Sequence, residues 1–406
     1  MAKRATTPVE QRTDLSGSRG LLICGASFAG LMVARQMAGS GADVLLLDRY
    51  EIGERQTSAC AAPTAWLENL GLMESEKQRF DTVVAHTAHG STRLPVPWTF
   101  STFDYRTLCE LLWQDCDATF ETAKVNGRAE SNGDGAIAVD TDRGVIKAPL
   151  VVDAMGWKRV LAGGAGYQPP DAPLSRGLEV HPSGGRDDFE VWITRRYLPA
   201  GYGWSFPAGD EVRVGMGSFD PREPVRPPTD LLADDLPVEK DGYQGNWIPH
   251  KLRPATGNNV FFAGDSAGHC LPVTAEGIRP ALYFGLALGL ELRAVHQGLQ
   301  SREQALKNYS AFSDSHKPQF ELLLKLQNAV PKVHPRLVKP ILATALRGPA
   351  FNRYLDLMPP EFAETARVRG TGDTRLKDLL LEMPDVGEDQ DFNRPEDRGR
   401  PVDLGT

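Results

Sequence analysis

The chain of 406 residues lacks several features that would place it in a specialised class of protein. It has five cysteines, with no CxxC pair and no cluster of His and Cys, which argues against a disulfide framework or a zinc site. No apolar run reaches membrane-spanning length without a charge, and residues 1–18 lack the apolar core of a signal peptide. We therefore expect a cytoplasmic protein with reduced thiols.

An excess of positive charge is also lacking, because the formal net charge is −8. This balance argues against a general nucleic-acid-binding protein. Residues 317–353 depart from it, with seven Lys or Arg and a single acid among many leucines. This segment fits either the solvated face of a helical cap or a surface that attracts a phosphate-bearing or membrane-resident substrate, with peripheral membrane contact. Residues 384–406 are polar and acidic, so we expect a flexible tail there, as at residues 1–18.

The first patterned stretch reads as strand, glycine turn, helix and strand. The apolar run from Leu21 enters a turn, a helix is expected from about Ala29 to Ser40, and a second strand ends at Asp48. This is the layout of a dinucleotide-binding βαβ unit, in which Ser27 replaces the middle glycine. At this point either NAD or FAD fits the pattern. The residues expected to contact the cofactor here are Gly25, Ser27, Phe28, Ala29, Gly30, Asp48 and Arg49.

Two further stretches repeat the combination of a buried strand, an acid and a glycine turn. One runs from Leu150 through Asp153 to Gly156. The other follows the apolar strand 260–262 and carries Gly264 and Asp265. A helix is expected from near Glu276 to Gln297, and its amino end would present the N–H groups of Gly277 and Ile278 to a negative ligand.

Together the three turns resemble the FAD-binding fold shared by aromatic hydroxylases, flavin halogenases, lycopene cyclases and geranylgeranyl reductases, over roughly residues 20–365. The resemblance implies that the first turn holds the pyrophosphate, that the Asp153 turn supports the flavin and phosphates, and that Asp265 binds ribityl or ribose hydroxyls. The helix bearing Arg106 resembles an arginine-bearing helix near the FAD in these enzymes.

The expected fold is therefore α/β, with a discontinuous Rossmann-like FAD-binding domain, a β-sheet substrate domain and a helical C-terminal cap. We assign residues 19–75, 100–170 and 255–300 to the first, 76–99 and 171–254 to the second, and 301–365 to the third.

Aromatic residues alternate along residues 198–210, which places Tyr202, Trp204 and Phe206 on one face of a strand. They either cover the core of a second domain or form a wall of the substrate cavity. We assign Trp192, on a neighbouring strand, to the same substrate-binding set.

The segment Tyr202-Gly-Trp204-Ser-Phe206-Pro207 resembles the YxWxFP signature of geranylgeranyl reductases. Residues 272–278 resemble the segment that follows the Gly-Asp turn in the same family. Cys60 stands where those reductases carry a cysteine before two glycines, which are Ala61 and Ala62 here. The halogenase signature WxWxIP is related, but Tyr202 and Phe206 depart from it.

The resemblance implies an FAD-dependent oxidoreductase that reduces C=C bonds of a hydrophobic, prenyl-type substrate. Candidate proton donors are Cys60, Tyr202 and His269. Electrons would come from NAD(P)H, a ferredoxin or a separate flavin reductase. The alternatives are a flavin monooxygenase or halogenase acting on an aromatic or polyketide-like intermediate, a redox-neutral cyclase, and an FAD-bound scaffold without turnover.

Overall fold

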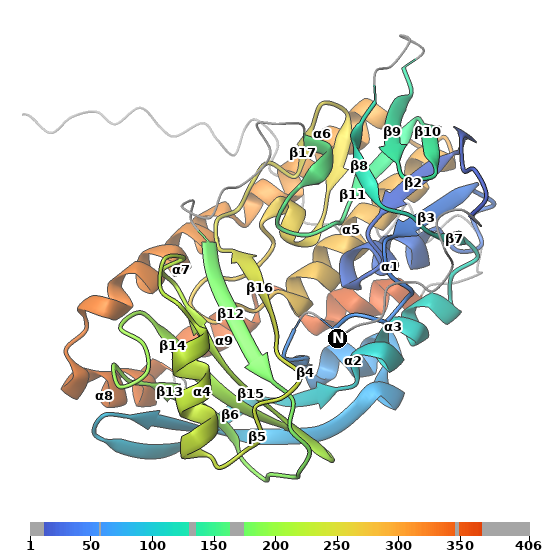
Figure 1. Cartoon of the computed structure of the whole chain (residues 1–406). Coiled ribbons are helices and arrows are strands. Elements are labelled where there is room, and N and C mark those ends of the chain that lie inside the picture. Colours follow the sequence, from blue (N-terminus) through green and yellow to red (C-terminus); the bar gives the residue numbers. More distant parts are fainter. Residues whose placement is uncertain (1–11, 57, 130–134, 163–173, 346–348, 368–406) are drawn as a thin grey trace, which may run out of the picture. The chain divides into compact units, whose positions relative to one another are not determined.

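The computed structural model describes residues 12–56, 58–129, 135–162, 174–345 and 349–367. These residues form one compact unit with three β-sheets and a set of α-helices (Figure 1), so the mixed α/β class is confirmed. The glycine run 163–166 and the expected tail at 384–406 lie outside the described residues.

A six-stranded sheet has the order β17-β18-β11-β2-β3-β7. Its strands are β2 (Leu21–Cys24), β3 (Val44–Asp48), β7 (Thr119–Thr122), β11 (Leu150–Asp153), β17 (Thr256–Gly257) and β18 (Val260–Phe262). All of its strand pairs are parallel except β17 with β18. The central strands are continuously apolar because a parallel sheet is covered on both faces.

The register of this sheet brings the ends of β2, β11 and β18 together. Asp153 on β11 is paired with Cys24 on β2 and with Phe262 on β18. Because these strands are parallel, the turns that follow them lie at one edge, which is where open α/β sheets bind ligands. The three glycine turns therefore lie together at this edge.

Helices α1 (Phe28–Met37) and α5 (Ile278–His296) pack closely against each other. A Cβ atom on Gly289 would lie 2.4 Å from Cβ of Gln36, and one on Gly285 would lie 2.9 Å from the carbonyl oxygen of Ala29. The two glycines, one helical turn apart, are therefore what allows this close approach. Helix α5 begins within two residues of the position expected from the sequence.

A four-stranded sheet, β1-β10-β9-β8, contains a strand that the sequence did not indicate. Its members are β1 (Gly17–Ser18), β8 (Val125–Arg128), β9 (Ile137–Thr141) and β10 (Gly144–Ala148). Strand β1 pairs with Ile146 and Lys147, and the Arg143 side chain donates a hydrogen bond to the Thr13 carbonyl at 2.9 Å. The expectation of a flexible tail over residues 1–18 is therefore wrong for residues 13–18.

An eight-stranded sheet has the order β16-β12-β15-β14-β13-β5-β6-β4. Its strands are β4 (Ala61–Pro63), β5 (Glu76–Thr87), β6 (Gly90–Phe103), β12 (Leu174–Val180), β13 (Phe189–Ile193), β14 (Gly201–Ala208), β15 (Glu211–Ser218) and β16 (Gln244–Pro249). Helix α4 (Arg226–Asp235) covers one face, where Leu232 packs with Val214 and Met216. The opposite face carries the aromatic residues of β14.

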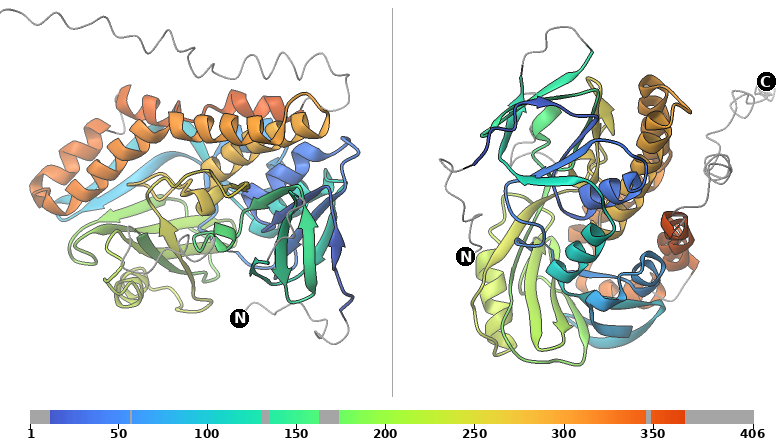
Figure 2. Two further views of the ribbon diagram at one scale, coloured as in Figure 1. Left: turned by 90° about the horizontal axis from the view of Figure 1, so that it is seen from above. Right: turned by 90° about the vertical axis from the view of Figure 1, so that its right-hand side faces the viewer.

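The C-terminal helices form a layer that extends beside both large sheets (Figure 2). They are α6 (Arg302–Ser315), α7 (Lys317–Ala329), α8 (Pro335–Ala345) and α9 (Pro349–Leu355), followed by the 3-10 helix η7 (Pro360–Arg367). Helix α2 (Thr64–Leu70) ties this end to the first half, since the Trp66 indole donates to the Met358 carbonyl at 3.2 Å. Within the described part of the chain, no helix is both long enough and apolar enough to cross a membrane.

Candidate active site

The first glycine turn, between β2 and α1, has no room for side chains at its two glycines. A Cβ on Gly25 would lie 2.4 Å from the Ala154 carbonyl oxygen, and one on Gly30 would lie 1.8 Å from that of Gly25. Gly25 also has a φ of +111°, which favours glycine. The turn is thus held tightly against the turn after β11, as a pyrophosphate-binding turn requires.

Ser27, in place of the middle glycine, precedes the amino end of α1 and makes no capping hydrogen bond. Its hydroxyl oxygen instead accepts a hydrogen bond from Tyr105 at 3.1 Å, and the Tyr105 ring packs edge-on against Phe28. Because no acid lies in the first helical turn, the N–H groups at the start of α1, including Ala29, remain suited to an anion.

Asp48, at the end of β3, lies next to this turn. Its carboxylate accepts the N–H groups of Ala26 at 2.8 Å and Tyr50 at 3.0 Å. Burial raises the pKa of Asp48, and these hydrogen bonds oppose the shift. Arg49 is exposed and lies over the Tyr50 ring.

Arg106 is the second residue of helix α3 (Tyr105–Gln114), whose N-cap is Asp104. Its side chain is exposed, and its Cα atom would lie 2.9 Å from a Cβ placed on Gly53. The segment after β3 is therefore packed against the start of α3, close to Ser27 through Tyr105.

Asp153 is fully buried and joins two of the three turns. Its carboxylate accepts the N–H groups of Met155 at 3.0 Å and Leu161 at 2.8 Å, and the Ser266 hydroxyl at 2.8 Å. Burial raises its pKa, against these hydrogen bonds. This arrangement favours an organising role for Asp153 over direct contact with a ligand. Gly156, by contrast, has a φ of +84° and open space where a Cβ would stand.

Asp265 follows Gly264 in the 3-10 turn after β18, and it differs from the other two acids. Among the described residues, none forms a hydrogen bond with its carboxylate. Burial raises its pKa to about 6, and the charge of Arg253 opposes this. A Cβ on Gly277 would lie 3.8 Å from Asp265 Oδ1, so the carboxylate lies beside the amino end of α5, where Ile278 begins the helix. An acceptor without a donor fits a ribityl or ribose hydroxyl, and the three turns together fit FAD.

The aromatic face of β14 is held by polar contacts at its ends. Tyr202 donates to the Thr274 carbonyl oxygen, and burial raises its pKa. The Trp204 indole N–H donates to Glu179 at 3.0 Å, and Phe206 stacks on Phe189 with a centroid distance of 3.9 Å. Tyr202 therefore connects this face to the segment between Asp265 and α5.

Glycine on the adjacent strand makes room for Trp204. A Cβ on Gly215 would lie 2.4 Å from the indole ring, so the ring lies directly over this position. Burial raises the pKa of Glu179, but the hydrogen bonds from His181 and Gln244 together with the charge of Arg213 outweigh it and lower the carboxyl pKa. A buried anion thus fixes the edge of the indole.

Trp192 does not belong to this face. On β13 it is paired with Gly203, whereas Val191 is paired with Trp204. Since neighbours in a strand point to opposite faces, Trp192 packs on the side covered by α4 and stacks on His86 at a centroid distance of 4.6 Å. The structure therefore separates Trp192 from Tyr202, Trp204 and Phe206, and its assignment to the substrate-binding set stays a prediction.

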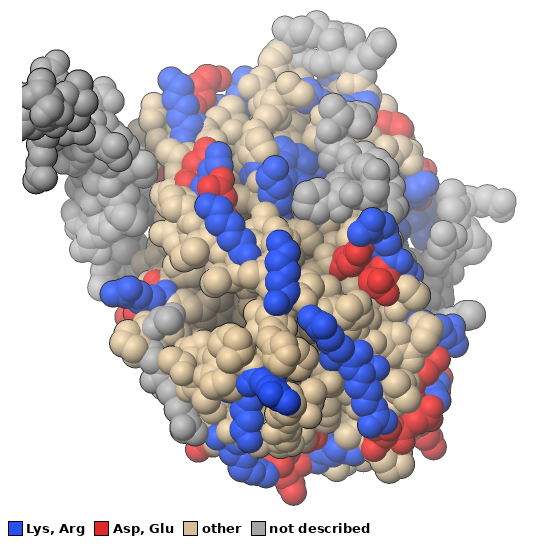
Figure 3. All heavy atoms as spheres, turned by 90° about the vertical axis from the view of Figure 1, so that its left-hand side faces the viewer, with Lys and Arg blue, Asp and Glu red and all other residues tan. Residues whose placement is uncertain are grey.

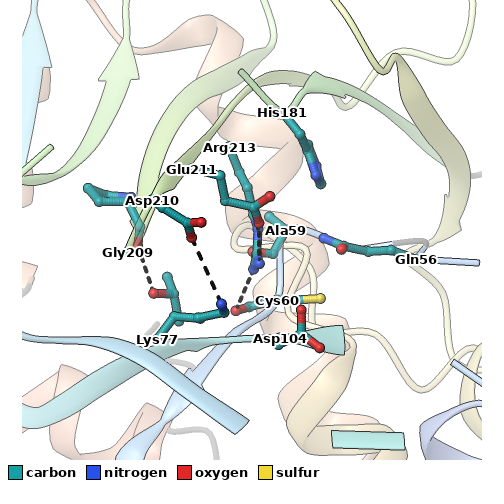
Figure 4. A network of polar contacts seen from close by, with 12 residues as sticks. Gln56, Ala59, Cys60, Lys77, Asp104, His181, Gly209, Asp210, Glu211 and Arg213 are labelled. Carbon is teal, nitrogen blue, oxygen red and sulfur yellow. Dashed lines mark hydrogen bonds and ion pairs between the residues drawn. The ribbon is translucent and has the colours of Figure 1, made fainter. Parts of the chain in front are cut away.

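Cys60 is fully buried, with a φ of +51° that is uncommon outside glycine. Arg213 holds this backbone, donating to the carbonyls of Ala59 at 2.9 Å and Cys60 at 3.2 Å while pairing with Glu211 at 2.7 Å (Figure 4). The Cys60 thiol donates to the Ser58 carbonyl, and burial raises its pKa. A protonated thiol fits a proton donor better than a nucleophile.

Sequence reasoning missed Arg213 and Glu179. Both are charged residues at inward-facing positions of otherwise alternating strands, and that mismatch is the signal that could have identified them.

His269 lies away from this group, in an aromatic cluster beneath α5 and α6. Its ring stacks on Phe284 at a centroid distance of 3.7 Å, and its Nε2 is 3.0 Å from the Ser313 hydroxyl. Burial lowers its pKa strongly. A neutral ring packed in this way favours a structural role over proton transfer.

No family model matches the chain. Among curated proteins, digeranylgeranylglycerophospholipid reductase 3 from Methanosphaera stadtmanae is 24% identical, over 73% of this chain and 82% of the relative. Digeranylgeranylglycerophospholipid reductase 1 from Methanopyrus kandleri is 23% identical, over 80% of this chain and 94% of the relative.

Solved structures share the fold. A geranylgeranyl bacteriochlorophyll reductase-like protein from Thermoplasma acidophilum superposes with a TM-score of 0.71 at 15% identity, covering 86% of this chain and 98% of that chain. A probable FAD-dependent monooxygenase from Pseudomonas aeruginosa gives 0.59 at 17% identity, covering 84% and 99%. The chain therefore has the fold of FAD-dependent oxidoreductases, and in sequence it resembles the geranylgeranyl reductase family.

Proposed function

We propose that the chain is an FAD-dependent reductase that saturates C=C bonds of a prenyl-type chain. The observation that carries this proposal is the hydrogen bond from Tyr202 to Thr274, which joins the aromatic face of β14 to the segment beside Asp265. An apolar wall is thereby attached to the cofactor site. The similarity to prenyl reductases over most of the chain supports the same substrate class.

Reduced FAD, when bound, supplies hydride at its flavin ring. The chain would bind the pyrophosphate at the amino end of α1 and a sugar hydroxyl at Asp265. The amino end of α5, at Gly277 and Ile278, would stabilise negative charge beside it. The buried face of Trp204 and Phe206 would exclude water from an apolar substrate.

Hydride addition to an alkene must be matched by a proton on the neighbouring carbon. The Cys60 thiol is protonated and lies beside the sheet that carries Trp204. Tyr202 donates to the Thr274 carbonyl and the Cys60 thiol donates to the Ser58 carbonyl, so proton donation by either group would require its hydrogen bond to break. Cys60 and Tyr202 both remain candidate proton donors, and His269 comes last because of its packing.

We further propose that α7 and α8 bring the protein to an anionic lipid surface, where a prenyl lipid resides. Leu322, Leu326, Leu337 and Ile341 are 49–58% exposed. Exposed basic residues lie among them, namely Lys325, Lys332 and Arg336. Figure 3 shows Lys and Arg distributed across this face with uncharged surface between them. Exposed apolar side chains with interspersed cations are the combination that an anionic bilayer surface attracts.

Because the proposed cofactor is FAD, we propose the electron donor from those that reduce flavins. A reduced nicotinamide, a ferredoxin or a separate flavin reductase can each supply it. Rapid-mixing reduction of the bound flavin by NADPH, with and without a prenyl substrate, distinguishes the first from the other two. Reoxidation of the flavin by a prenyl alkene without oxygen then tests the reductase proposal, and reoxidation that needs oxygen would point to a monooxygenase.

A further inference from the structure

The segment Pro272–Gly277, termed here the α5 entry loop, connects the turn of Asp265 to helix α5. Two of its residues have left-handed backbone conformations without being glycine: Val273 has a φ of +71° and Ala275 a φ of +53°. For a β-branched residue such as Val273 this is a strained conformation, which persists only where surrounding contacts impose it.

One of these contacts comes from helix α7. The N–H of Val273 donates to Gln327 Oε1 at 2.9 Å. Gln327 is 1% exposed and lies on the same side of α7 as the buried Phe320, whereas Leu322 and Lys325 face outward. The second polar atom of this amide, Nε2, is buried, and no described residue forms a hydrogen bond with it. A buried amide that makes only one of its hydrogen bonds costs free energy. We infer that the bond to Val273 sets the orientation of the Gln327 side chain.

Helix α9 holds the other side of the loop. Tyr354 donates to Glu276 Oε2 at 2.5 Å and accepts from the Thr274 hydroxyl at 2.7 Å. Glu276 is in turn paired with the buried Arg279 at 2.7 Å, and Arg279 donates to the Leu355 carbonyl at 2.6 Å. Thr274 and Glu276 are therefore both hydrogen-bonded to Tyr354 of α9. The contact of the α5 entry loop with α7 is the hydrogen bond between Val273 and Gln327.

We propose that Gln327 is a positioning residue, which holds the α5 entry loop in the strained conformation that presents Gly277 and the amino end of α5 to the cofactor. It acts through Val273 and touches no reacting atom. The inference rests on the assignment of FAD to the Asp265 turn, and it does not depend on which substrate is reduced.

The test compares the FAD-bound proteins carrying Gln327→Met, Gln327→Glu and Asn328→Met. Methionine removes the acceptor at similar volume, and glutamate keeps one. Asn328 is the exposed neighbour on α7 and serves as the control. We expect amide exchange at Val273 to become about tenfold faster in Gln327→Met and to remain slow in the other two. We also expect the midpoint potential of the flavin to become more negative in Gln327→Met only.

Unchanged exchange at Val273 in Gln327→Met, or an equal change in Asn328→Met, would overturn the proposal. If Gln327→Met fails to fold, Val273→Gly provides the second test. Glycine adopts this φ without strain, so Val273→Gly combined with Gln327→Met should fold and keep a potential near that of the wild type, as should Val273→Gly alone. A large negative shift in Val273→Gly would contradict the role of the strained backbone. Since exchange and potential need no prenyl substrate, failure of the proposed reductase activity would leave these outcomes unaffected.

Discussion

The Ser266 hydroxyl donates a hydrogen bond of 2.8 Å to Asp153 Oδ1, 113 residues away in the sequence. This bond joins the turn after β18 to the turn after β11, and Asp153 is fully buried at the junction. The geometry of the proposed cofactor site therefore depends on an acid that is itself enclosed by protein groups.

Replacing Ser266 with Ala should lower the free energy of unfolding by about 1–3 kcal/mol, because a buried carboxylate loses one of its donors. Urea denaturation measures this. Ser310→Ala, on the outer part of α6, is the matched control and should cost less than about 0.5 kcal/mol. Equal losses in the two variants would show that the bond to Asp153 contributes little.

Asp265→Asn should weaken FAD binding by roughly tenfold or more, since an amide is a weaker acceptor for a sugar hydroxyl than a carboxylate. Fluorescence titration of the deflavinated protein with FAD gives the dissociation constant. The far-ultraviolet circular dichroism spectrum should match that of the wild type. Unchanged affinity would refute the role of Asp265.

The pKa of Asp265 also predicts how the stability of the deflavinated protein depends on pH. In the folded state it is raised to about 6, and in the unfolded state it is about 3.9. The protonated carboxyl favours the folded state, so its contribution is complete below about pH 4 and is lost as pH rises to about 6. Above this pH, Asp265→Asn should be more stable than the wild type by roughly 3 kcal/mol. Parallel stability curves from pH 4 to 7 would contradict the shift.

Gly215→Ala should disturb the aromatic face, because the added methyl group would overlap the Trp204 indole. Gly217→Ala is the matched control, since its Cβ would lie 3.4 Å from the same ring. We expect roughly tenfold loss of kcat/KM for a prenyl substrate in Gly215→Ala and less than about threefold loss in Gly217→Ala. Tryptophan fluorescence reports whether the indole has moved. A larger loss of kcat/KM in Gly217→Ala than in Gly215→Ala would contradict the proposal that Trp204 lines the substrate cavity.

Charge reversal by Lys325→Glu and Lys332→Glu should reduce cosedimentation with phosphatidylglycerol vesicles roughly tenfold or more, in a manner that added salt diminishes. Lys307→Glu, exposed on α6, is the control and should have less effect. If vesicle binding changes equally in all three variants, or in none, the proposal is contradicted. Helices α7 and α8 would then form a cap whose basic face is only solvated.

Much of the cofactor site was predictable because it depends on local signals. Gly30 is required by a backbone contact with Gly25 within one βαβ unit, Gly25 has a φ that favours glycine, and Asp265 follows a short apolar strand that must be buried. The parallel register then places the three turns together, which strand polarity alone implies.

The substrate face was less predictable because it depends on pairing between strands. Alternation within β14 correctly grouped Tyr202 with Trp204, but the register of β13 against β14 decides that Trp192 faces the other way. The hydrogen bond between Gln327 and Val273 could not be predicted either, because only the packing of α7 brings Gln327 next to the α5 entry loop. Contacts of this kind join residues far apart in the sequence and leave no periodic signal.

The most direct test of the account is a single-turnover experiment under strict anaerobiosis. The flavin is first reduced chemically, a geranylgeranyl-chain substrate is added, and the flavin spectrum and product mass are followed. The account predicts reoxidation of the flavin with a gain of two hydrogens in the product. Flavin that stays reduced until oxygen is admitted, followed by a product with an added oxygen atom, would contradict it.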